Sequence, residues 1–193
     1  IIGIAPFNVP LALSSNKIDK AIAAGNSFIL KPSEHTPISG LILAETYEEA
    51  GLPPGVLNVL PGDGSIGNKL VQHPDVNMIL FTGSTKTGKA IAQAAAKDLK
   101  KVHLEMGGKS PLIVLADADI NYAVNTACFS IFNHQGQVCM ASSRIIIEEA
   151  LYDDFCKRLV KKATSLKVGE PGDMETIIGP LIRAEQCPFI KKQ

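Results

Sequence analysis

The chain alternates short apolar runs with longer amphipathic segments, and this alternation restricts the fold more than any other feature of the sequence. The segments between the runs carry helix signals, such as Pro37 in a first turn and Gly51 after a last turn. Strands that alternate with helices are typical of a parallel sheet in an α/β fold. We expect strands at 27–31, 56–60, 78–81, 102–105, 111–115 and 144–148, and helices over 36–50, 65–72, 85–96, 120–132 and 151–165. The first of these helices is expected to present an apolar face made of Ile38, Leu41, Ile42 and Leu43.

Two consecutive glycines, Gly107 and Gly108, interrupt the alternation before it restarts. A glycine pair is a natural hinge, so we predict a domain boundary there, with domains at 1–107 and 108–193. The chain begins at Ile1 inside a strand-like run, and its last residues complete no obvious domain. We therefore expect both ends to be cut.

Charge and cysteine usage argue against several functional classes. Nineteen Lys and Arg balance nineteen Asp and Glu, which leaves no basic surface for nucleic acid or for an anionic membrane. No apolar run is long enough to span a bilayer, and no secretory signal is present. The four cysteines form no CxxC pair and none lies beside a histidine at ligand spacing, so no metal site is predicted. Such sparse cysteines fit a reducing cytosol, and we expect a cytoplasmic protein.

A glycine-rich turn lies between the strand at 78–81 and the helix at 85–96. Its small residues would let a phosphate approach backbone N–H groups and the positive end of the helix dipole. Residues 83–89 also satisfy most of the Walker A pattern, but Ala90 stands where a Ser or Thr would bind Mg²⁺, which argues against an ATPase. The full GxGxxG dinucleotide pattern is absent, and an ordinary βα turn remains an alternative.

Polar residues also follow other predicted strands. Lys31 and Glu34 stand where the first strand ends, at the edge where open α/β sheets bind ligands, and could bond the hydroxyls of a ribose. A solvated charge pair is the alternative. Glu105 lies between Leu104 and Met106, an apolar setting that would raise its pKa and suit a general base. An ordinary exposed carboxylate at a strand end is the alternative.

One of the four cysteines, Cys139, is predicted to be a nucleophile because it lies in a Gly- and Ser-rich loop between a helix and a strand. Cys128 and Cys156 lie on amphipathic helices, where cysteine packs as a small apolar residue. His134 precedes Cys139 by five positions and would allow a Cys–His dyad, but a histidine at a helix end is more often a surface residue.

Taken together and in order, these motifs resemble the aldehyde dehydrogenase superfamily over essentially the whole chain. The matching motifs are APFNVP (5–10), KPSE (31–34), GLPPGVLNVLPG (51–62), FTGSTKTGK (81–89), LEMGGKSP (104–111) and GQVCMASSR (136–144). The separation of Glu105 and Cys139, 139 − 105 = 34 positions, also agrees with the family. The resemblance implies a Rossmann-like cofactor domain up to about Gly107, incomplete at its N-terminus, followed by the first part of an α/β catalytic domain.

The resemblance also implies a role for each motif. Cys139 would attack an aldehyde, and the Asn8 side-chain amide with the Cys139 backbone N–H would form the oxyanion hole. Hydride transfer to a nicotinamide would leave a thioester, which water activated by Glu105 would hydrolyse to the carboxylic acid. The implied cofactor contacts are Lys31 and Glu34 at the adenosine ribose, Ser84 at the pyrophosphate, and Gly83 and Gly88 where close approach is needed.

Particular residues indicate which cofactor and which type of reaction to expect. The Glu34 carboxylate would repel a 2′-phosphate, so NAD is favoured, with NADP possible in the family. Glu105 indicates hydrolysis, because members that transfer the acyl group to coenzyme A lack this base. Phe7 and Met106 replace the commoner Trp and Leu and should change only the shape of the pocket.

The length of the chain departs from the family, whose members are more than twice as long and form homo-oligomers through strands that are absent here. Much of the aldehyde-binding funnel is also absent, so the identity of the aldehyde is open. We expect the 193-residue chain to be inactive alone, since a truncated sheet leaves an unpaired edge and an uncovered apolar face. The alternative function is an inactive fragment or pseudoenzyme that retains only nucleotide or partner binding.

Overall fold

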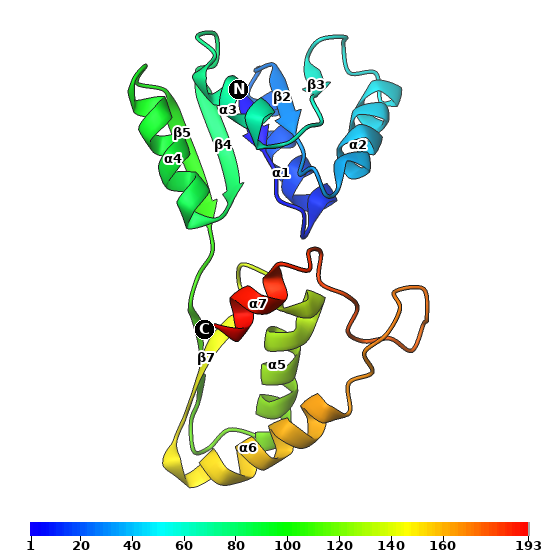
Figure 1. Ribbon diagram of the computed structural model, residues 1–193, viewed down its shortest axis with the longest axis vertical. Helices are drawn as coiled ribbons and strands as arrows, with labels where there is room; N and C mark the ends of the chain where they lie inside the picture. Colours follow the sequence, from blue (N-terminus) through cyan, green and yellow to red (C-terminus); the bar gives the residue numbers. More distant parts are fainter. Residues whose placement is uncertain (193) are drawn as a thin grey trace. The chain divides into compact units, whose positions relative to one another are not determined.

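The computed structural model describes residues 1–192 and divides the chain into two compact units, Ile1–Gly107 and Gly108–Gln193. The first unit contains a five-stranded parallel sheet with strand order β3-β2-β1-β4-β5 (Figure 1). Its elements in chain order are β1 (Ile2–Ile4), α1 (Pro10–Ala23), β2 (Phe28–Lys31), α2 (Pro37–Glu49), β3 (Leu57–Val59), α3 (Gly64–Gln72), β4 (Met78–Gly83), α4 (Thr85–Ala96) and β5 (Lys101–Met106). The alternation predicts the parallel α/β sheet, and the strand order makes the architecture doubly wound.

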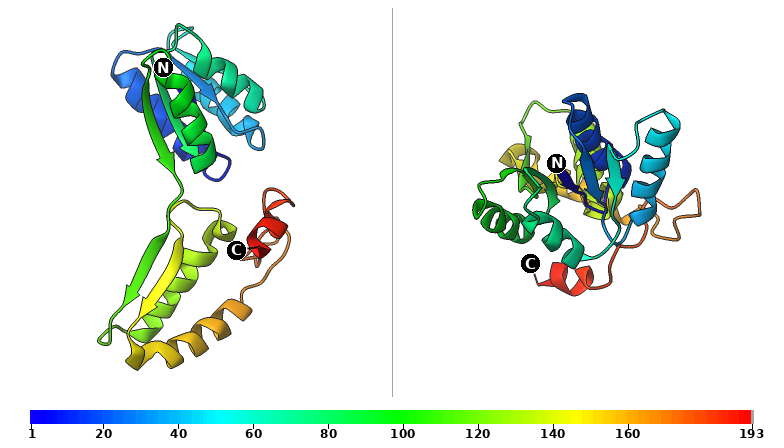
Figure 2. Two further views of the ribbon diagram at one scale, coloured as in Figure 1. Left: turned by 60° about the vertical axis from the view of Figure 1, so that its left-hand side comes forward. Right: turned by 90° about the horizontal axis from the view of Figure 1, so that it is seen from above.

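Helices cover both faces of the sheet in the first unit, with α1 and α2 on one face and α3 and α4 on the other (Figure 2). Strand side chains alternate between the two layers. Ile79 and Phe81 of β4 pack with α3 and α4, whereas Phe28 and Leu30 of β2 pack with α1 and α2. All four are buried. The inner strands β1, β2 and β4 are therefore mostly apolar, because they are covered on both faces, whereas the edge strand β5 is largely exposed.

The apolar face that the sequence predicts for α2 is mostly wrong. Ile38, Leu41 and Ile42 are 68%, 41% and 48% exposed, and only Leu43 of the four packs against the core. The helix instead approaches the sheet through Gly40, where an added Cβ would lie 3.0 Å from the Cβ of Pro32. The lack of a side chain at Gly40 decides which side of α2 faces the sheet. A prediction based on the spacing of apolar side chains does not detect this, because glycine has none.

The chain order of the strands defines where a ligand can bind. From β1 the chain first builds outward through β2 and β3, then returns to the other side of β1 with β4 and β5. At such a switch point the two neighbouring βα connections diverge and open a crevice at the carboxyl ends of the strands. The segment after β1, the end of β2, the turn after β4 and the end of β5 all lie along this edge, because the strands are parallel.

The second unit is built on a two-stranded parallel sheet, with β6 and β7 paired and α5 packed between the sheet and α6 (Figure 2). Its core contains Val114, Ala127 and Phe155, all buried. The elements are β6 (Ser110–Val114), α5 (Ile120–Phe132), the 3₁₀ helix η1 (Asn133–Gly136), β7 (Ser142–Ile147), α6 (Glu149–Thr164) and α7 (Gln186–Lys191).

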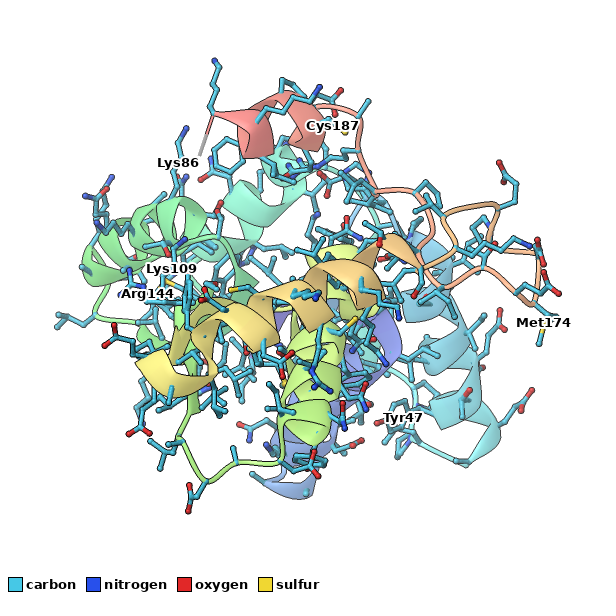
Figure 3. All side chains as sticks on the ribbon, turned by 90° about the horizontal axis from the view of Figure 1, so that it is seen from below. Tyr47, Lys86, Lys109, Arg144, Met174 and Cys187 are labelled. Atoms are coloured by element: carbon cyan, nitrogen blue, oxygen red, sulfur yellow. The ribbon has the colours of Figure 1, made fainter. Side chains whose placement is uncertain are left out.

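A loop follows α6 and is closed at its base by the backbone bridge between Val168 and Ile178. The Lys167 ammonium group forms ion pairs across the loop, 2.9 Å from a carboxylate oxygen of Asp173 and 2.8 Å from one of Glu175. Figure 3 shows Met174 at the outer end of this loop, where its side chain is 98% exposed. The loop returns the chain toward the end of α5.

The sequence did not indicate α1. Its buried side includes the polar Ser14 and Lys17 beside Ile18 and Ala21, so the apolar periodicity is broken where the helix meets the sheet. In residues 1–192, no helix combines the length and the apolar character needed to cross a membrane.

Candidate active site

Lys31, the last residue of β2, is buried with only 4% of its surface exposed. Its ammonium nitrogen lies 3.2 Å from the carbonyl oxygen of Pro32 and 3.5 Å from a carboxylate oxygen of Glu34. The pKa of the Glu34 carboxyl is lowered, mainly by a hydrogen bond from its own backbone N–H; burial opposes this shift, and the charge of Lys31 adds to it. The two residues thus form an ion pair with the cation inside and the half-exposed carboxylate at the rim.

A cavity of about 210 Å³ adjoins this ion pair between α3 and α4. Lys31 forms part of its wall, and the remaining walls are mostly apolar or small, contributed by β1, α3 and α4. Gly67 keeps the wall open on the α3 side, since an added Cβ would lie 3.8 Å from the Lys31 side chain. The cavity is mostly apolar next to a charged rim, a combination that suits an aromatic base attached to a polar sugar.

Helix α4 begins at the carboxyl end of β4, with Ser84 as its N-cap. The Ser84 hydroxyl oxygen accepts a hydrogen bond from the Thr87 N–H at 3.2 Å and lies 2.9 Å from the Thr87 hydroxyl. The first turn of α4 directs backbone N–H groups and the positive end of the helix dipole to the sheet edge.

Both glycines of this turn also have a packing role that the sequence did not indicate. A Cβ added at Gly83 would lie 2.5 Å from the ring of Phe81, and one added at Gly88 would lie 2.7 Å from the Met106 sulfur. Gly88 therefore allows α4 to lie close against β4 and β5, and Gly83 leaves room for the Phe81 ring. This close packing brings the start of the helix down to the edge where Lys31 lies.

Glu105 stands near the end of β5, beside Thr82 of β4 in the sheet register. Its side chain is 63% exposed, so the apolar setting expected from Leu104 and Met106 is wrong. The reason is the position of β5 at the sheet edge. His103, two residues earlier on the same side of the strand, lies with its Nε2 3.1 Å from a Glu105 carboxylate oxygen.

A buried lysine beneath this edge was missed by sequence reasoning. The Lys17 ammonium group, on α1, donates to the Thr82 hydroxyl at 2.7 Å and to the Leu13 carbonyl at 3.1 Å. Burial lowers the pKa of Lys17, and the negative charge of Glu105 opposes that shift. Lys17 thus connects the helix that follows Asn8 to Thr82 of β4, the residue beside Glu105 in the sheet register.

Cys139 lies in the second unit, in the loop between η1 and β7, and is exposed. Cys128 is buried in α5, as predicted for a packing cysteine, and Cys187 is exposed in α7 (Figure 3). Gly108 lies next to this loop: a Cβ added at Gly108 would be 3.4 Å from the Cys139 carbonyl oxygen. His134 precedes the loop with a left-handed backbone, φ 57°.

The first unit thus brings seven of the eight predicted site residues to one edge of its sheet or to the segments that leave it. They are Asn8, Lys31, Glu34, Gly83, Ser84, Gly88 and Glu105. The eighth, Cys139, belongs to the second unit. In residues 1–192, no group of three or more His, Cys, Asp or Glu side chains is placed to hold a metal ion.

A family model described as the aldehyde dehydrogenase family matches residues 1–193. The chain belongs to this family. Among curated aldehyde dehydrogenases it is 50% identical over 191 residues to benzaldehyde dehydrogenase of Bacillus subtilis, covering 98% of this chain and 39% of that protein. It is 48% identical over 184 residues to vanillin dehydrogenase of Amycolatopsis sp., covering 95% and 38% of the two chains.

Solved structures of similar proteins give the same result for the fold. The Escherichia coli structure described as an NADP dependent enzyme matches with a TM-score of 0.95 and 40% identity, over 99% of this chain and 40% of that one. The predicted family and α/β fold are confirmed. The chain spans about two fifths of the length of the aldehyde dehydrogenases that it matches.

Proposed function

We propose that the chain carries the cofactor-binding and nucleophile-bearing parts of an enzyme that oxidises an aldehyde to a carboxylic acid with NAD⁺ or NADP⁺. One observation supports this most strongly: the family match extends over all 193 residues, and Asn8, Glu105 and Cys139 are all present within it. A decayed pseudoenzyme would be expected to lose at least one of these groups. A cytoplasmic location and homo-oligomers of the whole protein remain predictions.

The carboxyl edge of the first unit fits a dinucleotide. The cavity between α3 and α4 would hold the adenine, Lys31 and Glu34 would bond the hydroxyls of its ribose, and the start of α4 at Ser84 would face the pyrophosphate. Gly83 and Gly88 would keep this approach open. When bound, the nicotinamide cofactor supplies an acceptor for the hydride that leaves the substrate.

In the proposed reaction, the Cys139 thiolate attacks the aldehyde carbonyl and forms a carbon–sulfur bond. The Asn8 amide and the Cys139 backbone N–H donate to the oxygen as it gains charge, an effect worth about 3–4 kcal/mol for one such donor. After oxidation the acyl group remains on the Cys139 sulfur as a thioester. Glu105 takes a proton from water, which then attacks the acyl carbon and releases the acid and the thiol.

This scheme is tested in the protein that carries this chain, with benzaldehyde and vanillin as substrates because two relatives are named for them. We expect aldehyde-dependent reduction of NAD⁺ that Cys139→Ser abolishes. Glu105→Gln should instead accumulate an acyl group on Cys139, which mass spectrometry of the cysteine peptide detects. A Glu105→Gln variant that turns over normally, with no acylated Cys139, would rule out the proposed base.

We propose also that residues 1–193 do not turn over an aldehyde by themselves. In the second unit α5 and α6 cover one face of β6 and β7, and Ile113 and Ile146 on the other face are 62% and 49% exposed. An open apolar face of this kind is normally covered by another part of a protein, so the catalytic part is incomplete without that cover. Steady NADH formation by the purified 193-residue chain would overturn this proposal.

A further inference from the structure

The segment just before the Cys139 loop has an unusual backbone. His134, Gln135 and Gly136 are three consecutive residues with left-handed φ angles of 57°, 58° and 71°. Only glycine adopts this region readily, and L-residues adopt it singly rather than in succession. The turn therefore needs contacts that hold it, and these contacts decide where the following residues, including Cys139, lie.

Two glutamine side chains supply such contacts. The Gln137 side-chain oxygen accepts a hydrogen bond from the Ile182 N–H at 3.0 Å, across 45 residues of sequence, and its nitrogen donates to the His134 carbonyl at 3.3 Å. The Gln135 amide, in the orientation that satisfies both its ends, accepts from the Gly179 N–H at 3.1 Å and donates to the same carbonyl at 3.0 Å.

Both amides therefore join the left-handed turn to one stretch of backbone, residues 178–182, which we name the strap. Figure 1 shows the strap returning from the loop that Lys167 closes and passing the end of α5 before α7 begins. The base of that loop is fixed by the Val168–Ile178 bridge, so the strap starts from an anchored point. Two hydrogen bonds, from backbone N–H groups of the anchored strap to the side-chain amides of Gln135 and Gln137, can hold the strained turn in place.

The turn is continuous with the nucleophile loop. One residue separates Gln137 from Cys139, and the loop closes with a hydrogen bond from the Ala141 N–H to the Val138 carbonyl at 3.1 Å. On its other side the loop lies against Gly108. A shift of the Gln137 backbone would therefore move Cys139 and its N–H group directly.

From this geometry we propose that Gln137, assisted by Gln135, is a positioning residue that fixes Cys139 and its backbone N–H through the strap. The proposal rests on the proposed function, in which the Cys139 sulfur attacks a carbonyl carbon. It assigns to the strap, far from Cys139 in sequence, a role in the acylation step.

The test uses the 193-residue chain and p-nitrophenyl acetate as the probe. In that reaction the Cys139 sulfur bonds to the acetyl carbon, p-nitrophenolate leaves with the electron pair of the broken C–O bond, and the thiol proton passes to solvent. Alkylation of the same sulfur by iodoacetamide is measured in parallel. Acylation requires a developing oxyanion to be met by oriented donors, whereas alkylation requires only an ionised thiol. The ratio of the two rates therefore reports orientation, and hydrogen exchange elsewhere in the second unit separates a local change at Gln137 from a general loss of structure.

The variants test separately the acceptor oxygen and the donor nitrogen of the Gln137 side chain. Gln137→Met keeps the length of the side chain but removes the acceptor for Ile182. We expect about tenfold faster hydrogen exchange at the Ile182 amide, the effect of one lost hydrogen bond, and a fall of about tenfold in the acylation-to-alkylation ratio. Gln137→Glu keeps an acceptor oxygen and should retain protection at Ile182 and most of the ratio. Gln93→Met, on the exposed side of α4, is the matched control and should change neither.

Each outcome decides the proposal. If Gln137→Met speeds exchange at Ile182 but leaves the ratio unchanged, the strap has a purely structural role and the proposal is overturned. Equal losses in Gln137→Glu and Gln137→Met would overturn the assignment to the Ile182 bond. Wild-type Cys139 that is acylated no faster than the exposed Cys187 would instead refute the nucleophile of the proposed function. Exchange at the amides of β6 and β7 shows whether each variant is folded.

Discussion

At the scale of single residues, the Lys31–Glu34 pair is the proposed contact with the adenosine ribose and would therefore influence the choice between NAD⁺ and NADP⁺. The Glu34 carboxylate is about half exposed at the rim, where it would meet the 2′ position of an adenosine ribose, and Lys31 holds it there from the buried side. We predict that Glu34→Gln lowers the ratio of NAD⁺ to NADP⁺ affinity about tenfold, because a charge that repels the 2′-phosphate is removed. Calorimetric titration with each cofactor measures the ratio. Glu49→Gln, the same charge change at the end of α2, should leave it unaltered.

Lys17 allows a prediction about pH. Burial lowers its pKa from the ordinary 10.5, so the folded chain releases this proton at a lower pH than the unfolded chain does. In the window between the lowered value and 10.5 the unfolded chain binds more protons, and the free energy of unfolding therefore rises with pH. Lys17→Met should show a shallower rise than wild type in urea unfolding across that window. Parallel curves for the two proteins would mean that Lys17 titrates normally.

The candidate site was only partly predictable from the sequence. Cys139, Glu105 and Lys31 lie in local motifs that can be recognised without a fold. Lys17 and His103 lie in no such motif. Lys17 reaches Thr82 across 65 residues, and His103 approaches Glu105 only because both side chains leave β5 on the same side. Contacts of this kind follow from strand register and helix packing, which a motif does not contain.

At the scale of elements, the end of α4 carries strain that can be removed. The Leu99 N–H bonds to the Ala96 carbonyl and the Lys100 N–H to the Ala95 carbonyl, the Schellman arrangement, which places Leu99 at the left-handed position with φ 53°. The Leu99 side chain is 91% exposed, so it contributes little packing. The next residue, Lys100, points toward the end of α3, where its ammonium group donates hydrogen bonds to the carbonyl oxygens of Val71 and His73.

We predict that Leu99→Gly stabilises the first unit by about 0.5–1 kcal/mol, because glycine adopts the left-handed region without the steric cost of a Cβ. The midpoint of urea unfolding provides the measurement. Leu99→Ala removes the same exposed side chain but keeps the Cβ, and it should give no gain. Equal stabilisation by both variants would attribute the effect to lost apolar exposure.

Most elements were predictable because they carry their own boundary signals. The predicted helices at 85–96 and 120–132 match the observed bounds, with Ser84 and Asp119 as N-caps whose side chains accept from the first turn. The β6 and β7 strands differ from prediction by only one or two residues. The short helix α7 was also not predicted, but two failures have a clear cause: α1 and the buried side of α2 are where polar residues or a glycine make the tertiary contact. Those choices depend on the neighbouring element, so a count of apolar residues in one segment cannot find them.

At the scale of the whole chain, the residues proposed for cofactor binding and for covalent chemistry divide between the two units. The cavity and all five proposed cofactor contacts belong to Ile1–Gly107, whereas Cys139 belongs to Gly108–Gln193. We therefore predict that residues 1–107, produced alone, bind NAD⁺ with a dissociation constant within about threefold of that of the 193-residue chain, a difference below 1 kcal/mol. Calorimetry on both proteins makes the comparison, and Lys31→Met in each should weaken binding by the same factor. Loss of binding in 1–107 would mean that a needed contact comes from the second unit. The two functions would then be coupled, and the assignment of the cofactor site to the first unit alone would be wrong.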